Sequence, residues 1–98
     1  MNELRMNGSK WKSADNFYDA LFRVLGAPQW HGRNFNALRE SLAEGDINSV
    51  EPPFRIVITG GSTMGEGARQ VTQDFKDLIE ELTPELVKAN RFIELEIT

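Results

Sequence analysis

Apolar and polar residues alternate with a period of two in three short segments of the chain. Leu4 and Met6 alternate with polar neighbours, and the same alternation recurs over residues 54–59 and 93–97. A period of two is typical of a strand that is buried on one face only. The pattern therefore predicts three strands, each with one apolar face and one largely polar face.

Between these strands the apolar residues recur at helical spacing. The first helix begins at Ser13 or Asp15 and ends before Gly26 and Pro28, which are typical of a helix C-terminus. A second helix begins at Asn34 as its N-cap, and Gly45 can close it. Their apolar faces consist of Phe17, Leu21, Val24 and Leu25 in the first helix and of Phe35, Leu38 and Leu42 in the second.

A third and longest helix follows a glycine-rich loop at residues 60–67. Its apolar stripe consists of Val71, Phe75, Leu78, Ile79 and Leu82. Thr83 followed by Pro84 resembles an N-cap with proline at the first helical position. We therefore expect the long helix to end there and a short new helix to start.

The order of the elements determines the expected architecture. Helical crossovers join parallel strands and are almost always right-handed. Consecutive crossovers of one hand place all helices on one side of a sheet with strand order 1-2-3. We predict a two-layer α/β fold whose other sheet face is open to solvent. The open face would carry Arg5, Arg55, Glu94 and Glu96.

Composition limits the classes of protein to which the chain can belong. A chain of 98 residues corresponds to one domain, residues 1–98. Cysteine is absent, which excludes thiolate catalysis and cysteine-bound zinc. No apolar run is long enough to span a membrane, and the N-terminus lacks the apolar region of a secretory signal. These features predict a cytoplasmic protein without a membrane partner.

The charge is negative and unevenly distributed. The net charge is −4, and residues 72–98 alone carry seven acidic and three basic residues. Broad binding to nucleic acid needs a basic surface, so direct nucleic-acid partners are excluded. An acidic surface either serves solubility or faces a strongly positive partner, and composition leaves both readings open.

One segment carries a family resemblance. Residues 25–42 contain Pro28, the aromatic pair Trp30-His31, Gly32 and a second helix that begins at Asn34 and contains Ala37-Leu38 and Glu40. This arrangement resembles the barstar family, intracellular inhibitors of the ribonuclease barnase. The resemblance covers residues 13–42 and is looser afterwards, where Phe75-Lys76-Asp77 is similar to a step in the family's last long helix.

The resemblance implies inhibition by substrate mimicry. In this family the second helix and the preceding segment cover the active site of the nuclease, and acidic side chains take the places of RNA phosphates. The partner implied here is a ribonuclease or another nuclease-like toxin with a basic active-site cleft, so that the chain would serve as an immunity protein or antitoxin. The implied contact residues are Trp30, Asn34, Asn36, Arg39, Glu40, Asp77 and Glu81.

The chain departs from the family pattern at three of these positions. Asn36 replaces an aspartate, Glu40 replaces the principal aspartate with a side chain one methylene longer, and Arg39 replaces an aromatic residue. Arg39 has the wrong charge for a cationic active site. These departures favour a toxin other than barnase.

Other candidate sites in the sequence are weaker. His31 is the only histidine, which excludes a ribonuclease mechanism that uses two histidines and favours a structural role for this residue. No cofactor or metal site is expected, and the chain is not expected to be an enzyme. Two alternatives stay open. One is a small nucleotide-binding domain that uses the loop Gly60–Gly67, which lacks the Walker ending. The other is a barstar-like adaptor for a partner that is not a toxin.

Overall fold

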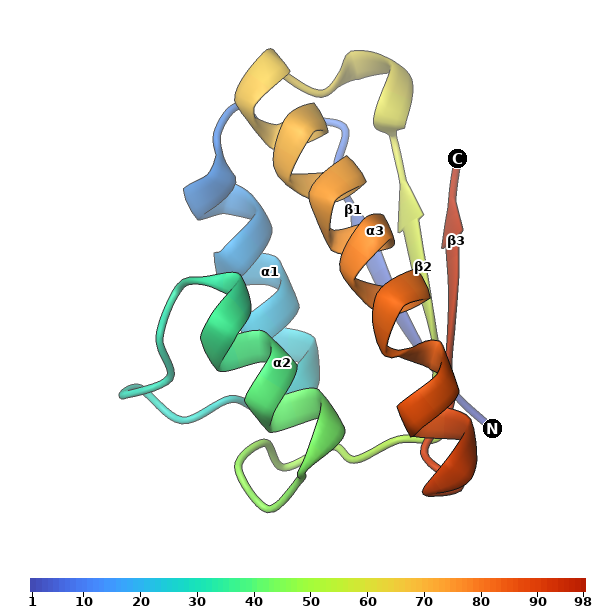
Figure 1. Ribbon diagram of the computed structural model, residues 1–98. Coiled ribbons are helices and arrows are strands. Elements are labelled where there is room, and N and C mark those ends of the chain that lie inside the picture. Colours follow the sequence, from blue (N-terminus) through green and yellow to red (C-terminus); the bar gives the residue numbers. More distant parts are fainter.

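The computed structural model describes residues 1–98 and contains three strands and three α-helices (Figure 1). In chain order the elements are β1 (Asn2–Asn7), α1 (Ala14–Leu25), α2 (Phe35–Ala43), β2 (Phe54–Thr59), the short 3₁₀ helix η1 (Gly61–Thr63), α3 (Glu66–Lys88) and β3 (Ile93–Ile97). The strands pair in parallel in the order β1-β2-β3. The predicted α/β architecture and strand order are therefore confirmed.

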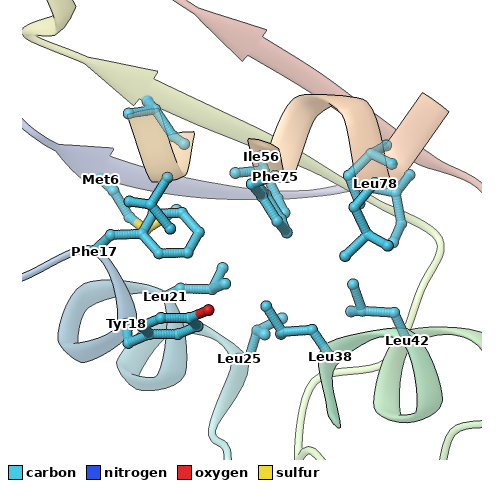
Figure 2. Packing of buried hydrophobic residues seen from close by; sticks show 14 of the residues in the cluster. Met6, Phe17, Tyr18, Leu21, Leu25, Leu38, Leu42, Ile56, Phe75 and Leu78 are labelled. Carbon is cyan, nitrogen blue, oxygen red and sulfur yellow. The ribbon is translucent and has the colours of Figure 1, made fainter. Parts of the chain in front are cut away.

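The helices lie together on one side of the sheet (Figure 1). α1 contacts β1, α3 contacts β3, and both α1 and α2 pack against α3. Side chains from all three helices meet the apolar face of the sheet in one core (Figure 2). Fully buried members of this core include Phe17, Leu21, Leu25, Leu38, Phe54, Ile56, Ile58 and Phe75.

The opposite face of the sheet carries a ladder of ion pairs. Arg55 on β2 donates to Glu3 on β1 at 3.2 Å and to Glu96 on β3 at 2.6 Å. Val57 is the register neighbour of Glu96 and is only 2% exposed, although it lies on this face. The one apolar residue at the centre of the open face is thus buried between strands that carry the charged Arg5 and Glu96 as its register neighbours.

The expectation that a new helix starts at Thr83-Pro84 is wrong. α3 runs without a break from Glu66 to Lys88 and contains Pro84 in its interior. Proline lacks the N–H of a helical hydrogen bond and normally disfavours such a position. The apolar stripe nevertheless continues from Leu82 to Leu86, and both side chains are buried. Burial of this additional turn against the core outweighs the local preference of proline.

Candidate partner-binding face

The segment between α1 and α2 is held in place by a buried histidine. The Nε2 atom of His31 lies 2.9 Å from Ser41 Oγ on α2, and Nδ1–H donates to the Gly32 carbonyl at 2.9 Å. The ring packs against Phe22, with 4.5 Å between ring centroids. His31 is therefore a structural residue, as the sequence favoured.

Trp30, the neighbour of this buried histidine, is exposed. It is 73% exposed, the most exposed large apolar side chain of the protein. The sequence left open whether Trp30 covers the core or lies at the surface, and the structure places it at the surface. Tryptophan side chains are mostly buried in folded proteins, and tryptophan is enriched among the residues that dominate binding interfaces.

Polar contacts hold both ends of α2. At its start, the backbone N–H of Ala37 donates to Asn34 Oδ1 at 2.8 Å, which makes Asn34 the N-cap. At its end, Arg91 donates to the Leu42 carbonyl at 3.1 Å and also to Glu51 at 3.1 Å. The resemblance implies that Asn34 contacts a partner, but in the structure its side-chain oxygen accepts a hydrogen bond from the backbone of α2.

Glu40 lies between two surface hollows. The first, of about 130 Å³, is lined by Trp30, His31, Gly32, Ala37, Glu40 and Ile47. The second, of about 400 Å³, is lined by Asn36, Arg39, Glu40, Ala43, Glu44 and Glu85. Glu40 is exposed and has no ion-pair partner within the protein. A carboxylate thus stands beside an exposed tryptophan on one side and an acidic hollow on the other.

Arg39 and Glu81 form an ion pair that joins α2 to α3. The guanidinium donates twice, from Nη1 to Oε1 at 3.0 Å and from Nη2 to Oε2 at 3.1 Å. These hydrogen bonds hold the pKa of the Glu81 carboxyl below its ordinary value, and the same contact raises the pKa of Arg39. Each charge therefore stabilises the other.

The structure brings together most of the residues expected at the site. Trp30 and Glu40 line the smaller hollow. Asn36, Arg39 and Glu40 line the larger one. The ion pair with Arg39 brings Glu81 to the same region. Asp77 lies one turn before Glu81 on α3 and is exposed, where its carboxylate accepts a hydrogen bond from Gln73 at 3.1 Å. No hydrogen bond or ion pair joins Asp77 to the residues of α2.

Among the residues that line the hollows, Glu44, Glu85 and Ile47 were not expected at the site from the sequence. Glu44 and Glu85 line the acidic hollow, and Ile47 lines the hollow of Trp30. Glu44 follows Glu40 by four residues, and Glu85 follows Glu81 by four. Residues four apart are neighbours on a helix surface, so this spacing could have indicated both carboxylates.

The glycine-rich loop has a structural explanation. Gly60 has a φ of 78°, which favours glycine. A side chain at Gly65 would meet the Lys12 carbonyl oxygen at 2.7 Å, so the backbones approach too closely for any other residue. Arg69 donates to the Met64 carbonyl at 3.2 Å and to two further carbonyls of the loop. The hydrogen bonds from Arg69 thus hold the backbone of the loop in place.

Two further features bear on the classes of function. No cluster of three or more His, Cys, Asp or Glu side chains is arranged to hold a metal ion. None of the helices combines the length and the apolar character that crossing a membrane requires.

Comparison with known proteins connects this face to a family. The family model described as "Barstar (barnase inhibitor)" matches residues 1–97, essentially the whole chain. No match was found among curated proteins. The three-stranded parallel sheet with helices on one face agrees with this family assignment. On the strength of the match over residues 1–97, the chain belongs to the barstar family of barnase inhibitors.

Proposed function

We propose that this protein is an immunity protein that blocks the active site of a ribonuclease-like toxin in the cytoplasm. The observation that carries the proposal is the position of Glu40, an exposed and unpaired carboxylate that shares a hollow with exposed Trp30. Family membership supplies the class of partner, a nuclease. A nuclease active site is built to bind phosphates, so a carboxylate held at the surface can occupy a phosphate position.

The residues of the face take different roles in this proposal. Glu40 carries the negative charge of α2, because Asn36 is neutral and Arg39 is paired. Trp30 is the apolar anchor, which fits the enrichment of tryptophan among dominant interface residues. Asp77 lies towards the rim, where a charge acts mainly on the association rate. Asn34 shapes the start of α2 and supports the face indirectly.

The proposal requires no cofactor and no catalytic step by this protein. Its only histidine is buried, and both ring nitrogens have hydrogen-bond partners. The inhibitor acts by occupying the cleft of the toxin and does not bind nucleic acid itself.

An inhibition assay tests the proposal. A nuclease captured from the native host by the wild-type protein would be assayed for RNA cleavage with increasing amounts of each variant. A carboxylate that is desolvated against a basic site contributes 2–5 kcal/mol or more on truncation, so Glu40→Gln should raise the dissociation constant at least about thirtyfold. Trp30→Ala should weaken inhibition by a similar factor.

Glu94→Gln is the matched control, since it removes one exposed carboxylate from the open face of the sheet. It should leave inhibition unchanged. Inhibition by Glu40→Gln at wild-type concentration, or the failure of the wild-type protein to inhibit any captured nuclease, would exclude the mechanism.

A further inference from the structure

The ion pair between Arg39 and Glu81 changes the charge that the binding face offers to a partner. Both carboxylate oxygens of Glu81 accept hydrogen bonds from one guanidinium, at 3.0 Å and 3.1 Å. This fork geometry is the strongest arrangement available to an arginine and a carboxylate. The Arg39 side chain is 42% exposed and the Glu81 side chain 62%, so the pair lies at the surface. The pair therefore presents a neutral unit beside the charged Glu40.

We propose that Arg39 is a specificity-determining residue of this face, because it withholds Glu81 from basic partners. The inference rests on the proposed function and adds to it the chemistry of the partner. A cleft with positive groups opposite both Glu40 and Glu81 meets a free carboxylate at the first position only. At the second it meets a carboxylate whose two oxygens already accept hydrogen bonds from Arg39.

The same geometry indicates what the preferred partner presents. Opposite Glu40 it carries positive charge. Opposite Arg39 it carries no positive charge and offers hydrogen-bond acceptors. Arg39 has five N–H donors and uses two of them on Glu81, so donors remain for a backbone carbonyl or a carboxylate of the partner. Arg39 lines the same hollow as Glu40, which places both groups within one contact area.

Barnase is a suitable probe, because the family model that matches this chain is described as that of the barnase inhibitor, and a ribonuclease has to bind the phosphates of RNA. Dissociation constants and association rates would be measured at low and high salt for the wild-type protein, Arg39→Ala, Arg39→Lys and the double variant Arg39→Ala with Glu81→Gln. Arg39→Ala should bind barnase at least about fivefold more tightly than wild type, with the larger gain at low salt. Arg39→Lys should stay within about threefold of wild type, since it keeps the charge.

The double variant separates the proposed cause from a simple loss of repulsion. If the gain comes from the released Glu81 carboxylate, Glu81→Gln should remove most of it. Arg5→Ala is the matched control, because Arg5 is also an exposed arginine paired to a glutamate, at 2.8 Å, but lies on the open sheet face. It should change the affinity less than twofold.

Three outcomes of the binding measurements would overturn the proposal. They are an Arg39→Ala affinity equal to or below wild type, a gain that persists in the double variant, and no detectable binding of Arg39→Ala to barnase at any concentration tested. An NMR titration of the Glu81 carboxyl should show its pKa rise in folded Arg39→Ala, and a pKa that stays unchanged would also overturn it. The proposed function is tested independently, by comparing how wild type and Glu40→Gln inhibit the captured nuclease.

Discussion

Replacing Asn34 with alanine separates a structural role from a binding role at a position that the family resemblance assigns to the partner. The side-chain Oδ1 accepts the N–H of Ala37 at 2.8 Å, and alanine removes this acceptor. Loss of an N-cap typically costs about 1 kcal/mol, within a range of about 0.5–2 kcal/mol. For a domain of this size the midpoint of thermal unfolding should fall by about 4–8 °C per kcal/mol.

Urea unfolding followed by circular dichroism measures this change. Asn36→Ala is the matched control, because it is the same substitution two residues further along α2, at an exposed position where the side chain makes no hydrogen bond within the protein. It should leave the free energy of unfolding within about 0.5 kcal/mol of wild type. Asn34→Ser keeps an acceptor at the N-cap and should recover most of the loss.

The reasoning would be refuted if Asn34→Ala and Asn36→Ala had the same stability. It would also be refuted if Asn34→Ser were as unstable as Asn34→Ala, since the acceptor oxygen would then not matter. A normal stability of Asn34→Ala together with lost inhibition would identify Asn34 as a direct partner contact.

Three further predictions concern the sheet, the long helix and the ion pair. Ile56→Ala should lower the free energy of unfolding by about 2–5 kcal/mol because it leaves a cavity in the core. Glu94→Lys, on the open sheet face, should change it by no more than about 0.5 kcal/mol. Equal losses in urea unfolding would contradict an open sheet face. Pro84→Ala should raise the free energy of unfolding by up to about 3 kcal/mol, because alanine restores a helical N–H, and a loss of stability on thermal unfolding would contradict this. The contact with Arg39 lowers the pKa of Glu81 in the folded protein, so its contribution to stability is present above the unfolded pKa and is lost as the pH falls through the folded pKa. Arg39→Ala lacks this contact and should therefore lose less stability than wild type over the same acidic range. Unfolding measurements at a series of pH values check this.

Local patterns were sufficient to predict the fold. Strands with one apolar face and helices with one apolar stripe leave few ways to form a single core, and right-handed crossovers reduce these to the order 1-2-3. Pro84 was misread because its effect was judged within one helical turn. The burial of Leu86 depends on the core as a whole and overrides the local signal.

The candidate face was predicted less completely, because the ion pair at its centre joins two distant parts of the chain. Arg39 and Glu81 are 42 residues apart, and no rule of spacing indicates that they meet across two helices. The exposure of Trp30 could not be predicted either, because the segment before α2 has no periodic pattern that indicates which of its side chains are buried. The family resemblance indicated which residues to examine, and only the structure shows which of them are already paired.

The two held ends of α2 have a thermodynamic consequence for association. A helix of nine residues is too short to be stable in water by itself, so its order comes from its surroundings. Three hydrogen bonds provide that order within the protein itself. The Ala37 N–H donates to Asn34, Ser41 is bonded to His31, and Arg91 donates to the Leu42 carbonyl. The entropy of ordering α2 is thus lost during folding, and binding through the proposed face would need no further ordering of this segment.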